Sequence, residues 1–181
     1  THEHKDHTAG MDDIRAFNFK QKKAMELFVD LNVEKCLKKE FSYAFKENPY
    51  PGVPKLNLNR IENKPFDVLG VIFQPIQLMH YKLPVFGYRI GDFAYCTDVN
   101  YISPSEKKKL TNLKVLVITA LRKETHISHF SLSEALELIS ELKPEKAYIT
   151  HVSHLLGLHE EVSKELPKNV EIAFDGLTIT I

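Results

Sequence analysis

The sequence has few cysteines, no excess of either charge and no long apolar run. Two of its 181 residues are cysteine, Cys36 and Cys96, and they form no CxxC pair. This usage excludes a disulfide-dense secreted scaffold and favours a reducing, intracellular setting. The 24 Lys and Arg residues balance 24 Asp and Glu residues. That balance excludes a protein that holds nucleic acid or anionic lipid by bulk positive charge.

No stretch reaches the roughly 18 apolar residues that a membrane span requires, and no signal peptide opens the chain. We therefore expect a soluble, cytoplasmic protein with no membrane partner. The length fits a single domain over residues 1–181. Residue 1 is Thr rather than Met, and candidate ligands begin at residue 2. We therefore expect the natural protein to continue upstream.

Predicted strands and helices alternate along the chain, which indicates a layered α/β domain. Ser131 and Glu134 form a capping box that opens a helix with one apolar face. We expect a single strand over 66–73. We also expect a closing hairpin around an Asp-Gly turn, with arms 170–174 and 177–181.

Residues 2–7 read His-Glu-His-Lys-Asp-His and form the richest cluster of candidate metal ligands. Alternate side chains of an extended segment point the same way, so His2 and His4 can converge on one ion. Asp6 and His7, in the following turn, can face a second ion. Imidazole and carboxylate donors suit zinc, manganese and iron, and a site without thiolate is seldom purely structural.

Three further candidate ligands follow predicted strands. His80 comes after the strand 76–79, Asp98 follows the strand 93–97 and His151 follows the strand 147–150. Strand ends on one sheet edge present their side chains to a common cleft. We therefore predict two ions, the first held by His2, His4 and His80, the second by Asp6, His7 and His151, with Asp98 bridging them.

The motif at residues 2–7, followed in order by His80, Asp98 and His151, resembles the signature of the metallo-β-lactamase superfamily. The segments 87–98 and 128–131 look most like the branch that contains the PhnP phosphodiesterase, a relative of ribonuclease Z and other transfer-RNA processing endonucleases. The resemblance implies an αββα sandwich with a dinuclear site at the edge of its two sheets. It also implies two divalent ions, zinc or manganese with iron as a third option. Because the family has strands ahead of the motif, it further implies that the N-terminal part of the first sheet is missing from this chain.

The resemblance assigns the chemistry as well. It implies hydrolysis by a hydroxide that bridges the two ions, with Asp6 orienting the attacking water. In this branch a histidine shortly before the last ligand donates a proton, and by position this residue is His129. We therefore expect a phosphodiesterase that acts on a small or cyclic phosphodiester.

Two alternative functions stay open. A thioester or lactam hydrolase would use the same hydroxide on a carbonyl, and the fold does not decide between the two. A metal-loaded but non-catalytic binding or carrier protein would tolerate replacement of His129. The balanced charge disfavours nucleic acid as a partner, and a homodimer is left open.

Simpler explanations exist for several of these residues. The histidines at 2–7 could be a tag, although a tag would not be accompanied by the ligands that follow the later strands. His126, His154 and His159 are expected to be ordinary surface or core residues. The loop 48–54, which holds three prolines and a glycine, is expected to border a site.

Overall fold

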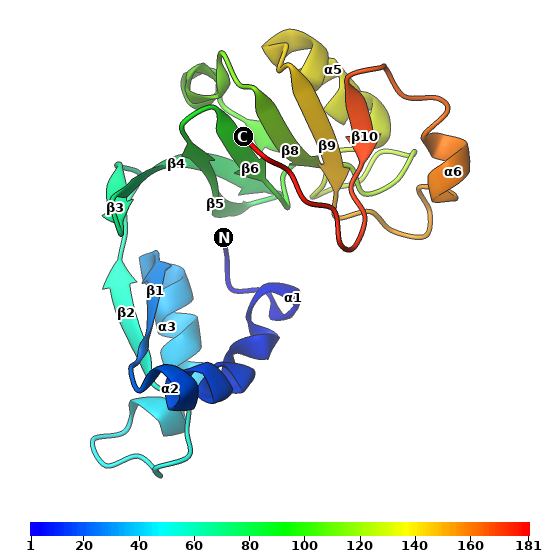
Figure 1. Cartoon of the computed structure of the whole chain (residues 1–181). Helices are drawn as coiled ribbons and strands as arrows, with labels where there is room; N and C mark the ends of the chain where they lie inside the picture. The colour runs from blue at the N-terminus through cyan, green and yellow to red at the C-terminus, as the bar shows by residue number, and fades with distance from the viewer. The chain divides into compact units, whose positions relative to one another are not determined.

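The chain divides into two compact units, Thr1–Glu62 and Asn63–Ile181 (Figure 1). The computed structural model describes all 181 residues. None of the helices combines the length and the apolar character that crossing a bilayer requires. The single domain expected over 1–181 stays a prediction.

The first unit opens with short helices, which are followed along the chain by a strand, a longer helix and a second strand. Its elements are α1 (Lys5–Thr8), η1 (Ala9–Ile14), α2 (Arg15–Gln21), β1 (Met25–Val29), α3 (Leu31–Glu40), η2 (Ser42–Phe45) and β2 (Leu56–Arg60), where η marks a 3-10 helix. β1 and β2 pair in parallel. The Asp30 carboxylate begins α3 by accepting from the N–H groups of Asn32 and Val33, at 2.7 and 2.9 Å. A small core packs α3 against the strands through Val29, Val33, Leu37 and Phe41.

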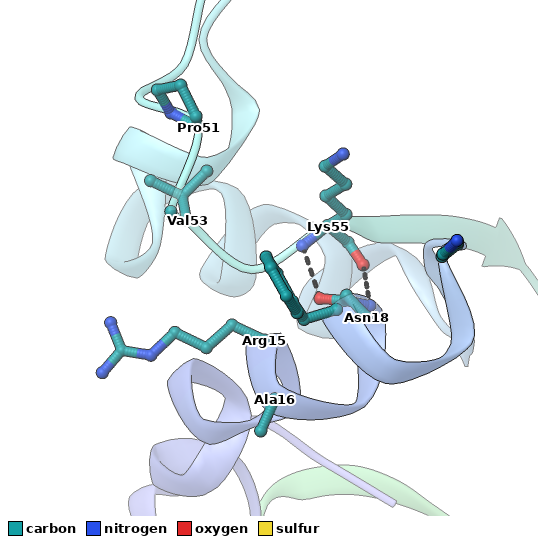
Figure 2. A pocket seen from close by; sticks show the side chains of 9 residues that line it. Arg15, Ala16, Asn18, Pro51, Val53 and Lys55 are labelled. Atoms are coloured by element: carbon teal, nitrogen blue, oxygen red, sulfur yellow. Dashed lines mark hydrogen bonds between the residues drawn. The ribbon is translucent and has the colours of Figure 1, made fainter.

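A cavity of about 680 Å³ lies between α2 and the proline-rich loop of the first unit (Figure 2). Asn18 joins its two walls, because its side chain donates to the Lys55 carbonyl at 3.0 Å and accepts from the Lys55 N–H at 2.9 Å. The loop 48–54 borders the cavity through residues 51–53. No carboxylate or imidazole lines it, so the cavity itself carries no metal ligand of those two kinds.

The second unit is one mixed sheet with helices. Its elements are β3 (Phe66–Val68), β4 (Val71–His80), β5 (Leu83–Ile90), β6 (Phe93–Cys96), β7 (Tyr101–Ile102), α4 (Pro104–Lys107), η3 (Lys108–Leu110), β8 (Val115–Thr119), α5 (Leu132–Leu142), β9 (Lys146–Thr150), α6 (His159–Val162) and β10 (Val170–Ile172). The strand order is β10-β9-β8-β6-β5-β4-β3, and β7 pairs with β4. Strands β10, β9, β8 and β6 are parallel. Because β4 and β6 are both antiparallel to β5, β4 also ends at the same sheet edge as the parallel strands.

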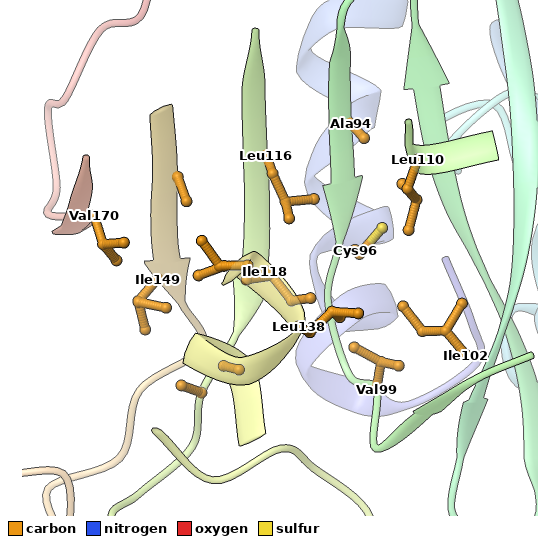
Figure 3. Close-up of a cluster of buried hydrophobic side chains, with 14 of the residues drawn as sticks. Ala94, Cys96, Val99, Ile102, Leu110, Leu116, Ile118, Leu138, Ile149 and Val170 are labelled. Atoms are coloured by element: carbon orange, nitrogen blue, oxygen red, sulfur yellow. The ribbon is translucent and has the colours of Figure 1, made fainter. Parts of the chain in front are cut away.

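The core of the second unit lies on the sheet face that α5 covers (Figure 3). Alternate strand residues point into it, among them Ala94, Cys96, Leu116, Ile118 and Ile149. The predicted capping box opens α5, and the structure confirms it. Burial raises the pKa of the Cys96 thiol to about 12. Both cysteines are free, as their spacing predicts.

Two predicted elements are wrong. The expected strand 66–73 is a hairpin, because Leu69 and Gly70 both have positive φ, 54° and 85°, and so form a tight turn between β3 and β4. The expected closing hairpin does not form: β10 pairs in parallel with β9, and residues 177–181 form no strand. Apolar side chains of this tail instead line a cavity of about 350 Å³ together with Phe93 and Tyr95. Since these two residues alternate with Ala94 and Cys96, the tail lies on the sheet face opposite α5.

Candidate metal centre

The four candidate ligands of the first unit lie in and just before α1. The ring centroids of His2 and His4 are 4.5 Å apart, and those of His2 and His7 are 4.2 Å apart. The His7 Nε2 atom is 3.3 Å from Asp6 Oδ2. His4 is the N-terminal cap of α1 and has an extended backbone. The change from extended chain to helix therefore brings three imidazoles and one carboxylate together over six residues.

The later candidate ligands gather at one edge of the second unit's sheet. His80 is the last residue of β4, Asp98 lies two residues beyond β6, and His151 directly follows β9. The ligating atoms of His80, Asp98 and His129 all lie within 4.8 Å of one another. His151 Nε2 is 3.2 Å from Asp98 Oδ1. Sequence positions from 80 to 151 are thus brought together by strands that end at the same edge.

The backbone is strained where the ligands leave the strands. Asp98 and His151 each have φ of 55°, and Tyr81, directly after His80, has φ of 58°. The left-handed conformation costs a non-glycine residue about 1–2 kcal/mol, and such residues concentrate at functional sites. The Asp98 turn is held by its N–H, which donates to Thr119 Oγ1 at 2.7 Å. The Thr97 hydroxyl donates to Asp98 Oδ2 at 2.6 Å and so orients the carboxylate.

His129 comes from the loop between β8 and α5, and hydrogen bonds hold that loop to the segments that carry Asp98 and His80. The Phe130 N–H donates to the Val99 carbonyl at 2.7 Å. The His80 Nδ1 atom is 2.8 Å from the Ser128 carbonyl. Because a carbonyl can only accept, His80 donates through Nδ1, and its neutral form then has the lone pair on Nε2. This is the arrangement in which an imidazole binds a metal through Nε2.

The environment of His129 favours the neutral imidazole. The residue is 8% exposed, and its Nδ1 atom is buried without a hydrogen-bond partner, 3.9 Å from Asp98 Oδ1. Burial, followed by the nearby His80, lowers the pKa of His129 to about 4, although Asp98 opposes the shift. The ring is therefore uncharged at neutral pH in the protein without ligands.

These residues fit a divalent metal ion. The second unit offers imidazoles and a carboxylate within 4.8 Å, and a buried ring nitrogen that lacks a protein partner. Nitrogen and oxygen donors without thiolate suit zinc, manganese and iron. The joining of both units' ligands into one two-ion centre stays a prediction.

One histidine lies nearer to the site than its sequence context predicts. The ring of His126 lies 5.2 Å from that of His129, which in turn stacks on His151 at 5.0 Å. Burial, and then the neighbouring Arg122 and His80, lower the pKa of His126. In the sequence, only its position three residues before His129 indicates that His126 lies near the site.

The comparison with known families identifies the fold. The model of the beta-lactamase superfamily domain matches residues 1–152. The chain belongs to the metallo-β-lactamase superfamily. Its predicted α/β class and metallo-β-lactamase fold are confirmed. Membership implies divalent metal ions, for which the imidazoles and carboxylates above are the candidate ligands.

Solved structures place this superfamily member in its PhnP-like branch. It is 30% identical to a new diphosphatase from the PhnP family, with a TM-score of 0.91, over 100% of this chain and 69% of that one. The short form of human tRNase Z is similar in fold, with a TM-score of 0.70 and 16% identity over 100% of this chain and 77% of that one.

A curated relative carries a different name. An octanoyltransferase of Porphyromonas gingivalis (strain ATCC BAA-308 / W83) is 34% identical over 183 residues. The match includes 100% of this chain but 37% of the relative. The chain thus spans little more than a third of the length of that protein.

Proposed function

We propose that this chain is a metal-dependent phosphodiesterase acting on a small or cyclic phosphodiester. The observation that carries the proposal is that two candidate ligands, His80 and Asp98, and the candidate proton donor His129 place their ring nitrogen and carboxylate oxygen atoms within 4.8 Å of one another. The relative named as a diphosphatase of the PhnP family supports phosphorus chemistry, because it is similar over this chain's whole length.

The candidate ligands are His2, His4, Asp6 and His7 of the first unit, and His80, Asp98 and His151 of the second. The chemistry that divalent ions supply when bound is a lower pKa of coordinated water and neutralisation of charge on phosphate oxygens. His80 is oriented for binding by the Ser128 carbonyl, and Asp98 by the Thr97 hydroxyl. Asp6 is assigned the orientation of the attacking water.

His129 is assigned proton transfer to the leaving-group oxygen. Its pKa of about 4 without ligands means that the ring needs a nearby negative charge to hold a proton at neutral pH. A phosphodiester carries that charge, and an opposite charge within about 4–6 Å favours a protonated imidazole.

The test is turnover of a cyclic nucleotide by the purified protein in manganese or zinc, comparing His129→Gln with His154→Gln, because its alkoxide leaving group needs the proton that His129 would supply. Loss of a proton-transferring group costs about 10²–10⁴-fold in rate, so we expect His129→Gln to lose turnover in that range and to keep its metal. His154 is exposed, and His154→Gln should match the wild type. Metal-loaded wild-type protein that does not cleave the phosphodiester would contradict the proposal.

A second candidate is acyl hydrolysis, which the name of the octanoyltransferase relative favours. An octanoyl thioester offered to the same metal-loaded protein separates the two candidates. Cleavage of the thioester without cleavage of the phosphodiester would establish the second candidate. Binding of either compound without turnover would indicate a carrier.

A further inference from the structure

One side chain of the second unit, Asn100, bonds to two segments that carry a residue of the candidate site. Its Oδ1 atom accepts from the Tyr81 N–H at 2.8 Å. Its Nδ2 group donates to the Ile127 carbonyl at 3.0 Å. Its own N–H donates to the Met79 carbonyl at 2.9 Å. Asn100 is partly buried, and both of its side-chain bonds lie where solvent reaches them.

Each bonded segment adjoins one of the clustered groups. Tyr81 directly follows His80, Asn100 itself lies two residues after Asp98, and Ile127 lies two residues before His129. A single carboxamide therefore connects the three segments that carry the cluster of His80, Asp98 and His129.

We propose that Asn100 is a positioning residue of the metal centre. It holds the loop that carries His129 against the strand ends that carry His80 and Asp98. The part of this inference that concerns turnover rests on the proposed function. The part that concerns metal affinity rests on the ligand cluster alone.

The bond to Tyr81 stabilises a strained turn. Tyr81 has φ of 58°, a conformation that a non-glycine residue adopts only when its surroundings hold it. The bond from Asn100 fixes the N–H group of that residue. Release of the turn would free the backbone next to His80 and loosen its imidazole.

The chemistry requires a carboxamide. Asn supplies one acceptor and one donor from the same planar group, whereas Asp at neutral pH supplies acceptors alone. Asn100→Asp therefore keeps an acceptor for the Tyr81 N–H but places an oxygen against the Ile127 carbonyl. Asn100→Ala removes both bonds, so the two variants separate the His80 side of the contact from the His129 side.

A matched control lies at the opposite edge of the same sheet. The Asn169 Nδ2 group donates to the Pro144 carbonyl at 3.4 Å, and these two residues precede β10 and β9. Asn169→Ala thus removes an amide-to-carbonyl bond between two loops of the same unit, at the edge where the strands begin.

The experiment compares the full chain carrying each substitution by three measurements. These are hydrogen exchange of the Tyr81 amide, manganese affinity by calorimetry, and kcat and KM for the same cyclic nucleotide. Loss of a group that orients metal ligands typically costs 10–100-fold in metal affinity or activity. We expect Asn100→Ala to exchange its Tyr81 amide faster and to bind manganese about 10–100-fold more weakly. Its kcat should fall, whereas its KM should not rise. We expect Asn100→Asp to keep Tyr81 protection and still to lose kcat at least tenfold, and Asn169→Ala to match the wild type in all three.

The inference is overturned if folded Asn100→Ala binds manganese as tightly as the wild type, or if Asn100→Asp retains wild-type kcat. Should Asn100→Ala fail to fold, Asn100→Asp decides by the same criteria. A wild-type protein that binds manganese but does not cleave the phosphodiester would contradict the proposed function alone. Tyr81 exchange and metal affinity would still judge the role of Asn100.

Discussion

At the scale of single residues, the site depends on groups that hold a ligand in place as much as on the ligands themselves. Asp98 occupies a left-handed conformation, and its carboxylate direction is set by Thr97 and its backbone by Thr119. His80 is fixed by a carbonyl from another loop. These bonds reduce the reorganisation that metal binding would otherwise require, which is the physical meaning of a prepared site.

The pKa of His129 gives a prediction at this scale. In the metal-free protein, NMR titration of its ring protons should show a midpoint near 4, because burial and His80 disfavour the charged form. The same protein unfolded in urea should show that histidine titrating near the ordinary 6.5. A folded-state midpoint at or above 6 would contradict the structure's account of this ring.

The same shift predicts how stability depends on pH. Because folding lowers the pKa of His129, the unfolded state binds a proton more readily. Above the ordinary value of 6.5 the shift leaves the free energy of unfolding unchanged, and that free energy falls as the pH is lowered from 6.5 toward 4. Urea unfolding of the metal-free protein between pH 7 and 4 should therefore show a shallower decline for His129→Gln than for the wild type.

At the scale of elements, strand direction decides which side chains meet. β4, β6, β8 and β9 all end at one sheet edge, and His80, Asp98, Thr119 and His151 lie at or just after those ends. The central strands also approach one another closely at Gly87 on β5. A Cβ atom at Gly87 would lie 2.8 Å from the Tyr95 carbonyl oxygen, 2.9 Å from Leu78 Cδ1 and 3.0 Å from Cys96 Sγ.

Gly87→Ala should therefore destabilise the second unit. The added methyl group meets backbone and buried side chains that cannot move away, and overpacking of this kind costs about 1–3 kcal/mol. Urea unfolding of the metal-free protein measures the change in the free energy of unfolding. Gly10→Ala is the control, because nothing lies within 4 Å of a Cβ atom there; a loss at Gly10 as large as that at Gly87 would contradict the steric argument.

At the scale of the whole molecule, two compact units each supply part of the candidate ligand set. The first supplies the histidine-rich segment before and within α1, and the second supplies the strand-end residues. Similarity to the PhnP-family diphosphatase extends over the entire chain, so both units belong to the common fold. The octanoyltransferase relative is much longer than this chain, and its name therefore bears on this chain as a proposal.

Metal binding should stabilise the folded chain measurably. A ligand that binds the folded state alone at 100 times its Kd adds about 2.7 kcal/mol to stability. Adding manganese or zinc to chelator-treated protein should raise its melting temperature, and EDTA should reverse the increase. Asp98→Asn should bind metal more weakly and show a smaller increase. An unchanged melting temperature at millimolar metal would argue against a metal centre.

The sequence by itself determined the fold class, the candidate ligands and the strand ends that carry the later ones. Spacing alone places His2 and His4 before a turn that holds Asp6 and His7, and apolar runs that stop at His80, Asp98 and His151 show where strands end. These signals are local, because they depend on periodicity and on residues a few positions apart. The capping box at Ser131 is local in the same way, and the structure confirms it.

The tertiary structure alone decided the features that depend on distant pairing. The parallel pairing of β10 with β9 and the path of the tail over the sheet depend on apolar packing between segments far apart in sequence. The proximity of His126 to His129 and the bonds of Asn100 to Tyr81 and Ile127 depend on how loops from different strands meet. No periodicity marks such contacts, because their energy is gained only when the sheet has brought the segments together.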